Sequence, residues 1–450
     1  MAPISRRLSI SEALQSARET RAVVIGKNNL GEAPGIFQKQ FPGATPIIIS
    51  DETTFGLAGA ALSAAFEGAG IPMAKPFIFT DPDLYAEYRF VTQLENALRQ
   101  HNAIPVALGS GTINDLTKLA AHNVGRSYMC MATAASMDGY TAFGASITYQ
   151  GSKQTFNCPA PVAVLADLEI IRHAPTDMTA SGYADLLAKV TAGADWILAA
   201  GLGIEKIDQQ AWDIVQGGLR EALNNPAAVR NRDAHAINSL TEGLMLGGFA
   251  MQWTKSSRPA SGAEHQFSHL WDMQHHTHNG KAPSHGFKVG IATLAITALY
   301  EQLLKMPLDK LDIHSACANW PDEKELETCV RKEFASDDFT DKAWEETRAK
   351  YVSRAELRAQ LEKLRQLWPT LQEELRAQLI PYTQLKQMLQ QVGAPVEPEQ
   401  IGISRERLKK AFVQAYYIRR RFTVLDVARR AGVLHDCLNA LFGKSGIWPI

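Results

Sequence analysis

The pattern of hydrophobic positions divides the chain into two parts. Short β-branched runs alternate with helix-like stretches up to about residue 170, and alanine- and leucine-rich helical periodicity dominates from about residue 175 onward. The predicted strands are AVVIG at 22–26, PIIIS at 46–50, PFIFT at 76–80, IPVAL at 104–108, SYMCM at 127–131 and VAVLADL at 162–168. Nearly continuous apolar strands between helices are typical of a parallel sheet covered on both faces. The pattern therefore predicts an α/β domain over 1–172 and an all-helical domain over 173–450.

Three stretches add detail to this division. The segment ASITYQGSKQTFNCPAP predicts a hairpin around Gly151, and the start of the chain predicts a short amphipathic helix rather than a signal peptide. Residues 320–380 are rich in charges of both signs, which favours solvated helical faces. The basic triplet 419–421 likewise favours an exposed surface.

Composition narrows the classes of function. The 450 residues include 46 Lys and Arg against 47 Asp and Glu, a net charge of −1, which argues against binding to nucleic acid or to an anionic membrane. No apolar run approaches the roughly 20 residues needed to span a bilayer. Five Cys without a CxxC pair suit a reducing compartment. We expect a cytoplasmic protein.

The segment VALGSGTINDLTKLAA at 106–121 indicates a phosphate-binding turn. A predicted strand ends, Gly109, Ser110 and Gly111 follow, and a helix begins. Glycine lets the backbone approach a phosphate, and the free N–H groups at a helix start favour its negative charge. No Gly-Lys-Ser/Thr closes the loop, which argues against an ATPase. A tight turn without a ligand is the alternative.

Two further features lie where parallel strands end. Asp51 directly follows a predicted strand, where an acid accepts hydrogen bonds from ribose hydroxyls, although it also suits an N-cap. The loop TAASMDGYTAFGAS begins with small residues at 133–136, which leave room for a flat ring or a sugar. Asp138 follows in a glycine-rich stretch, where a turn role is the alternative.

A histidine cluster indicates metal chemistry in the helical part. Six of the twelve His residues fall between 265 and 285. His265 and His269 are four residues apart and share a helix face, and His285 stands at a predicted helix entry. Neutral imidazoles suit Zn, Ni or Fe(II). The pair His275 and His276 favours an exposed surface.

A carboxylate is needed to complete a site with two histidines. The best candidate is Asp185 in SGYADLLAKVTAGADW, because it is an acid within a small and apolar helix. An unpaired charge would be costly in such a setting. Two histidines, one carboxylate and an open position describe a catalytic metal site.

These segments together resemble the bacterial sn-glycerol-1-phosphate dehydrogenases, a family of the superfamily of iron-containing alcohol dehydrogenase, glycerol dehydrogenase and dehydroquinate synthase. GSGTINDLTK, TAASMDGYTAFGASI, GYADLLAK, SGAEHQFSH and HGFKVG stand in the expected order. The resemblance covers roughly residues 20–300. It implies a Rossmann-like domain followed by a helical metal-binding domain, as in dehydroquinate synthase-like proteins.

The resemblance also implies roles for single residues. The metal ligands would be Asp185, His265 and His285. The residues in contact with substrate would be Asp138 and His269. The NAD(P) site would consist of Asp51, Gly109, Ser110, Gly111, Thr112, Ile113, Thr133, Ala134, Ala135 and Ser136. Lys189 and Lys288 are two candidates for the substrate phosphate, and each also suits a surface position.

The expected activity is the reduction of dihydroxyacetone phosphate to sn-glycerol 1-phosphate with NAD(P) and one divalent ion, in a homodimer. One alternative is another polyol or alcohol dehydrogenase, such as a glycerol dehydrogenase. A dehydroquinate synthase-like lyase would show no net change in NADH. A non-catalytic binding protein that keeps the fold is a third alternative.

Overall fold

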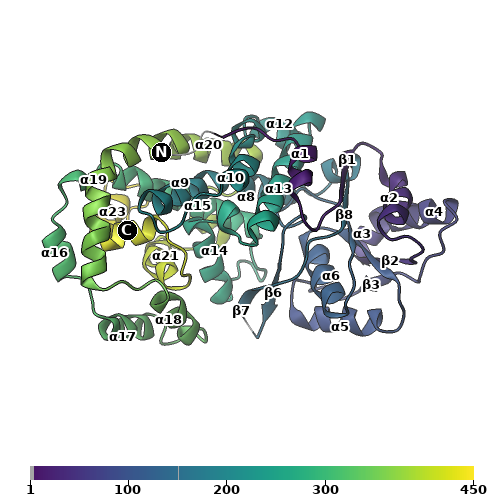
Figure 1. Cartoon of the computed structure of the whole chain (residues 1–450), viewed down its shortest axis with the longest axis horizontal. Helices are drawn as coiled ribbons and strands as arrows, with labels where there is room; N and C mark the ends of the chain where they lie inside the picture. Colours follow the sequence, from purple (N-terminus) through teal and green to yellow (C-terminus); the bar gives the residue numbers. More distant parts are fainter. Residues whose placement is uncertain (1–4, 151) are drawn as a thin grey trace.

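The computed structural model describes residues 5–150 and 152–450. A six-stranded parallel sheet forms the N-terminal half (Figure 1). In chain order its strands are β1 (Ala22–Gly26), β2 (Pro46–Asp51), β3 (Phe77–Phe79), β4 (Ile104–Gly109), β5 (Met129–Ala132) and β8 (Ala163–Asp167). Their order across the sheet is β1-β8-β5-β4-β2-β3. All six predicted strands are confirmed.

Helices cover both faces of this sheet. In chain order the helices of this half are α2 (Ala33–Gln40), α3 (Glu52–Thr54), α4 (Ala60–Gly68), α5 (Tyr88–Leu98), α6 (Gly111–Asn123) and α7 (Leu168–Arg172). Ile48 packs with Phe37 and Leu62 of α2 and α4, whereas its neighbour Ile47 belongs to the cluster that includes Leu94 of α5. Successive strand residues point to opposite faces, so each strand must be apolar along its length.

The predicted hairpin is confirmed. β6 (Ala145–Tyr149) and β7 (Ser152–Phe156) pair antiparallel outside the main sheet, while residue 151 lies outside the described residues. β7 packs against helix α14 of the other half. Figure 1 shows the hairpin between the two halves of the molecule.

The described residues after Asp167 form helices and no strand, as the periodicity predicts. The first group is α8 (Thr176–Leu187), α9 (Lys189–Gly201), α10 (Gln209–Gln216), α11 (Leu219–Ala222), α12 (Pro226–Arg230), α13 (Ala234–Thr254), α14 (Ala263–Met273) and α15 (His285–Leu303). The second is α16 (Ile313–Ala318), α17 (Glu323–Glu333), α18 (Thr340–Arg348), α19 (Arg354–Gln378), α20 (Tyr382–Val392), α21 (Arg405–Tyr417), α22 (Val424–Arg430) and α23 (Leu434–Phe442).

α15 is the central helix of this half. It is buried along most of its length and packs against α8, α14, α20 and α23. The buried Asp195 of α9 ties three later segments together. Its Oδ1 accepts hydrogen bonds from the Tyr300 hydroxyl (2.6 Å) and the Val424 amide (2.7 Å), and its Oδ2 accepts one from the Ala263 amide (2.7 Å). The last part of the chain is thus built into the helical half.

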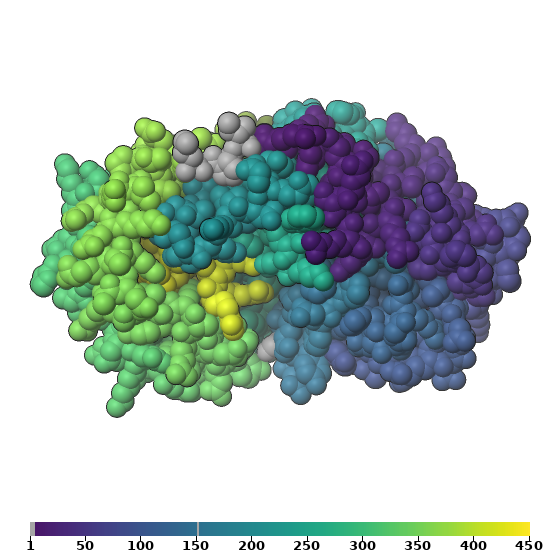
Figure 2. Space-filling view, in the orientation of Figure 1, coloured from purple at the N-terminus to yellow at the C-terminus, as the bar shows by residue number. Residues whose placement is uncertain are grey.

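The N-terminal residues join the two halves. Helix α1 (Ile10–Ser16), which confirms the predicted short helix, contacts α13. The amides of Glu19 and Thr20 donate to Gln252 Oε1 of α13 (3.0 and 3.3 Å) just before β1 begins. In Figure 2 the purple N-terminal atoms lie against the teal atoms of the helical half. The domain boundary at residue 172 therefore stays a prediction.

Among the described residues, every helix is too short or too polar to span a membrane.

Candidate active site

The glycine turn lies at the carboxyl edge of the sheet. β4 is flanked by β2 and β5, so residues 109–113 lie between the segments that follow those two strands. A Cβ on Gly109 would lie 2.5 Å from the Cβ of Ile113, so only glycine fits. Ser110 caps α6 without a side-chain hydrogen bond. The first N–H groups of α6 have no partner within the helix, and the geometry suits an anion.

Asp51 ends β2 and caps the turn that follows. Its Oδ1 accepts from the Thr54 amide at 2.7 Å, which confirms the capping alternative. The Thr54 amide and the Thr54 hydroxyl both donate to Oδ1 of this side chain. Capping and ribose binding are thus compatible, because a carboxylate has two oxygens.

The small residues at 133–136 follow β5 and lie next to the glycine turn. Thr133 donates its amide to the Gly109 carbonyl (3.2 Å), and the Tyr140 hydroxyl donates to the Ala134 carbonyl (2.7 Å). Thr133, Ala134 and Ala135 are buried and Ser136 is half-buried. This segment forms a tightly held wall beside the turn.

Lys118 of α6 fixes the loop that continues from this wall. Its buried Nζ donates to the carbonyls of Gly139, Ala142 and Gly144 at 2.9–3.0 Å. Sequence reasoning missed this lysine, although its place at the end of GSGTINDLTK is a usable signal. A buried ammonium needs such acceptors, because an unpaired charge inside a protein is costly.

Asp185, His265 and His285 come together in the helical half. One potential ligand atom from each lies within 4.8 Å of the other two. His265 Nε2 is 3.6 Å from Asp185 Oδ1, and the rings of His265 and His285 have centroids 5.3 Å apart. Burial lowers the pKa of His285 to about 3, so its imidazole is neutral as a metal ligand requires. The donor set fits one divalent ion.

Close helix packing brings these ligands together. A Cβ on Gly286, at the start of α15, would lie 1.9 Å from the carbonyl oxygen of Ser181 on α8. A Cβ on Gly182 would lie 1.9 Å from the carbonyl oxygen of Ala135. α8 is therefore in backbone contact with both the helix that carries His285 and the wall at 133–136.

Glu264 orients His265. Its Oε1 lies 2.8 Å from His265 Nδ1 and also accepts from the Gly262 amide at 2.6 Å, while its Oε2 accepts from the Thr191 hydroxyl at 2.8 Å. A carboxylate on one imidazole nitrogen fixes the tautomer and directs the other nitrogen to a metal. Glu264 stands directly before His265 in sequence, but that position gave no signal at the sequence level.

Asp138 and Lys189 complete the centre. The Asp138 amide donates to Asp185 Oδ2 (3.1 Å), and Lys189 Nζ lies 2.6 Å from Asp138 Oδ2 and 2.8 Å from Asp185 Oδ1. Burial and the neighbouring Asp185 raise the pKa of Asp138. Burial opposes the charge of Lys189, but the two carboxylates outweigh it and raise the pKa of that lysine.

His269 lies one turn after His265 on α14 and lines a cavity of about 1030 Å³. The two rings have centroids 6.4 Å apart. Burial, together with the charge of Arg419, lowers the pKa of His269 well below its usual value. Its Nδ1 has no hydrogen-bond partner within the described part of the chain. His269 thus lies beside the cluster of Asp185, His265 and His285 and faces the cavity.

Three expectations about other polar residues are corrected. Lys189 is fully buried between two carboxylates, and the buried Lys288 is paired with Asp272, so neither is a surface lysine. His276 is also buried, since its Nε2 lies 2.6 Å from the Ile401 carbonyl. Its neighbour His275 is exposed as expected.

Comparison with known proteins identifies the family. Residues 24–175 match the family described as iron-containing alcohol dehydrogenase. Glycerol-1-phosphate dehydrogenase [NAD(P)+] of Bacillus velezensis is 33% identical over 297 residues, which cover 65% of this chain and 74% of that protein. The enzyme of the same name from Bacillus licheniformis is 26% identical over 430 residues, with 94% and 92% covered. With the Halalkalibacterium halodurans enzyme, at 34% identity, the match covers 56% of this chain and 64% of that protein, slightly under two thirds.

Solved structures support the same fold. A probable glycerol dehydrogenase from Sinorhizobium meliloti has a TM-score of 0.58 at 14% identity, with 93% of this chain and 96% of that chain covered. A glycerol dehydrogenase from Schizosaccharomyces pombe has a TM-score of 0.58 at 13% identity, with 97% and 92% covered. At these identities the likeness concerns the fold. Together with the sequence relatives, it places this chain in the glycerol-1-phosphate dehydrogenase family of the iron-containing alcohol dehydrogenases.

Proposed function

We propose that the protein reduces dihydroxyacetone phosphate to sn-glycerol 1-phosphate with NAD(P)H and one divalent ion. The observation that carries this proposal is the convergence of Asp185, His265 and His285, with Asp185 on α8, the helix in contact with the wall at 133–136. The dehydrogenase names of the sequence relatives support the reaction class. When bound, the dinucleotide supplies a hydride and the divalent ion supplies Lewis-acid polarisation of a carbonyl.

The sheet half binds and orients the dinucleotide in this proposal. The amides at 109–113 hold the pyrophosphate, Asp51 accepts from ribose hydroxyls, and the residues at 133–136 line the nicotinamide end. The close packing of α8 on that wall excludes water from the space between nicotinamide and Asp185. Hydride transfer between two bound groups needs such fixed proximity.

The helical half binds and protonates the substrate. His265 and His285 present imidazole nitrogens beside the Asp185 carboxylate. His269 faces the cavity as a neutral imidazole and relays a proton: one ring N–H gives a proton to the C2 oxygen as the alcohol forms, while the other ring nitrogen takes one from water in the cavity. Asp138 holds a substrate hydroxyl, and Lys189 bridges the Asp138 and Asp185 carboxylates and offsets their mutual repulsion.

The first test is oxidation of NADH or NADPH by the metal-loaded protein with dihydroxyacetone phosphate, followed by chiral analysis of the glycerol phosphate. The proposal expects turnover and the sn-1 product. Turnover with unphosphorylated dihydroxyacetone alone would favour a different polyol dehydrogenase. No turnover with either ketone would contradict the proposal.

A second test uses the isosteric change Asp185→Asn. Wild-type protein is expected to retain about one divalent ion per chain after dialysis, as measured by elemental analysis, whereas the variant retains almost none and loses turnover. Bound metal and full activity in the variant would contradict the ligand assignment. Homodimer formation, which the resemblance implies, and location in the cytoplasm, which the cysteine usage suits, stay predictions; light scattering tests the first.

A further inference from the structure

The cavity that His269 faces carries an excess of positive charge. It is lined by residues of β7 and α14, of α18 and the segment after it, and of the segment that follows α21. Its basic lining residues are Lys153, Lys342, Lys350, Arg419, Arg420, Arg421 and Arg430, and its acidic ones are Glu205, Asp338 and Glu346. A cavity with seven basic and three acidic side chains favours an anionic ligand.

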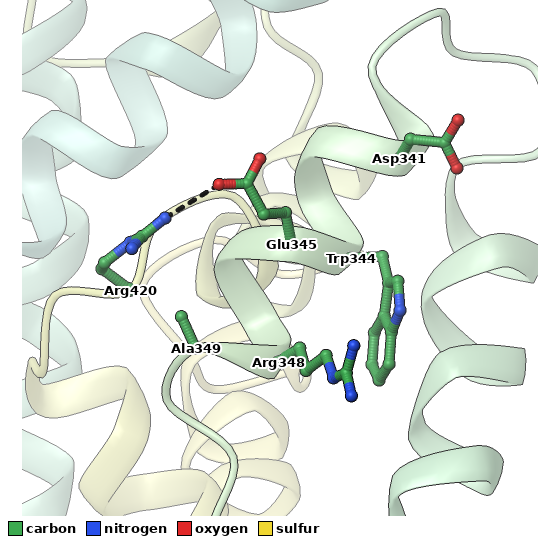
Figure 3. A pocket seen from close by; sticks show the side chains of 6 residues that line it. All are labelled: Asp341, Trp344, Glu345, Arg348, Ala349 and Arg420. Carbon is green, nitrogen blue, oxygen red and sulfur yellow. Dashed lines mark hydrogen bonds and ion pairs between the residues drawn. The ribbon is translucent and has the colours of Figure 1, made fainter.

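Most of these basic side chains already have partners. Arg420 and Lys342 pair with Glu345 and Glu346, Lys350 and Arg430 pair with Asp426, and Arg421 donates to the Ser261 carbonyl and the Ser257 hydroxyl. Figure 3 shows Arg420 directed at Glu345 on the outer side of α18, next to a second and shallower hollow. Four of the seven basic side chains are thus in ion pairs, and a fifth, Arg421, is held by neutral acceptors.

Lys153 and Arg419 are the two that remain. Both are half-buried, and neither side chain makes a hydrogen bond or an ion pair with the described residues. They come from two elements far apart in sequence, since Lys153 is on β7 and Arg419 directly follows α21. Both line the same cavity as His269. Half-buried charges without partners are costly unless a ligand compensates them.

We propose that Arg419 and Lys153 bind the phosphate of the substrate. The proposal rests on the proposed function and assigns the group that distinguishes a phosphorylated triose from an unphosphorylated one. An Arg guanidinium offers a planar fork of donors that matches phosphate oxygens, and a Lys ammonium adds a point charge. Lys189 and Lys288 cannot serve here, because carboxylates already hold them.

The decisive experiment compares two substrates in the metal-loaded full chain. For Arg419→Gln, kcat/KM with dihydroxyacetone phosphate is expected to fall about 10- to 100-fold, the range for hydrogen bonds to a charged group. The value with dihydroxyacetone should stay within about twofold. Lys153→Met should act in the same direction. Arg420→Gln removes the same charge from the adjacent residue and should leave both values nearly unchanged.

A titration with inorganic phosphate tests the subsite without turnover. Calorimetry should show binding to the wild type and to Arg420→Gln, and at least tenfold weaker binding to Arg419→Gln. If Arg419→Gln folds poorly, Arg419→Lys takes its place in the test. That variant keeps the charge and should retain part of the wild-type phosphate binding. This readout separates the two proposals, because phosphate binding can persist even if the wild type fails to reduce the ketone.

Two results would overturn the subsite assignment. The first is an unchanged preference for the phosphorylated ketone in both Arg419→Gln and Lys153→Met. The second is a loss of NADH affinity in Arg419→Gln with phosphate binding intact, since these side chains would then serve the dinucleotide.

Discussion

At the scale of single residues, the buried carboxylate pair Asp138 and Asp185 depends on Lys189 for compensation of its charge. Its ammonium lies within 2.8 Å of two carboxylates, and its side chain has no exposed surface. Without it, Asp138 and Asp185 would be two buried negative charges in one small space. Removal of one partner from a buried ion pair is strongly destabilising, because the remaining charge is left uncompensated.

Lys189→Met is therefore expected to lower the free energy of unfolding by about 3–5 kcal/mol. Urea unfolding at pH 7 measures this loss. The double variant Lys189→Met with Asp138→Asn should recover part of it, because one of the two unpaired charges is then gone. A single variant as stable as the wild type would show that the pairing contributes little.

Glu264 fixes the ring of its neighbour His265, one of the candidate metal ligands. Glu264→Gln should weaken metal affinity about 10- to 100-fold, since it removes the carboxylate that fixes the His265 ring. Competition with a chelator of known affinity measures this change. Thr191→Val removes only the hydrogen bond to Oε2 and serves as the control. Equal metal affinity in all three proteins would contradict the orienting role.

At the scale of elements, the position of α8 decides whether the cluster of Asp185, His265 and His285 lies beside the wall at 133–136. On one side the helix touches the carbonyl of Ala135, and on another it lies against the start of α15. Both contacts are backbone to backbone at a glycine, so no side chain can adjust to absorb an added atom. Asp185 follows Gly182 by one turn and is therefore held close to the wall at 133–136.

Gly182→Ala tests this packing. The added Cβ would lie 1.9 Å from a backbone oxygen, so the helix must shift, and we expect a loss of about 1–3 kcal/mol together with weaker NADH binding. Thermal unfolding and NADH fluorescence measure the two effects. Gly68→Ala is the control, because a Cβ there meets nothing within 4 Å, and it should be neutral or slightly stabilising. Normal NADH affinity in Gly182→Ala would contradict the assigned contact.

At the scale of the whole molecule, the last part of the chain completes the helical half and its cavity. Glu346 of α18 accepts from the amide, Nε and Nη2 of Arg420 at 2.8–3.0 Å, and thereby joins α18 to the segment after α21. Burial opposes the charge of Glu346, but the hydrogen bonds from Arg420 outweigh it and lower the pKa of that carboxyl to about 2. The yellow C-terminal atoms reach the surface near the joint between the halves in Figure 2.

This pKa predicts a pH-dependent contribution to stability. A carboxyl whose pKa is lowered on folding stabilises the fold above its unfolded pKa of 4.5, and that contribution is lost as pH falls toward 2. Because Arg420 is more than half exposed, we expect about 1–2 kcal/mol at pH 7. The stability difference between the wild type and Glu346→Gln should fall to less than half by pH 3. A difference independent of pH would refute the explanation.

Much of the fold follows from local pattern, and so does the list of candidate metal ligands, from which spacing alone did not exclude His269. The six strands and the change to helices after residue 175 were predictable, because both faces of the sheet are buried and the apolar runs are continuous. Asp185 stood out as an acid in an apolar helix, and His265 and His285 as members of a histidine cluster. Each of these signals lies within about 20 residues of sequence.

The remaining features depend on contacts between distant segments. The sequence alone determined the strands, the glycine turn after β4 and a short list of candidate metal ligands, because backbone preference and local polarity encode them. Spacing left His269 open beside His285, and the tertiary structure brings His285 together with Asp185 and His265. Only the tertiary structure decided that Lys189 is held by Asp138, that His276 is buried, and that Lys153 and Arg419 share a cavity. The physical reason is that the free energy of a charged side chain depends on which groups surround it, and packing brings those groups from elsewhere in the chain.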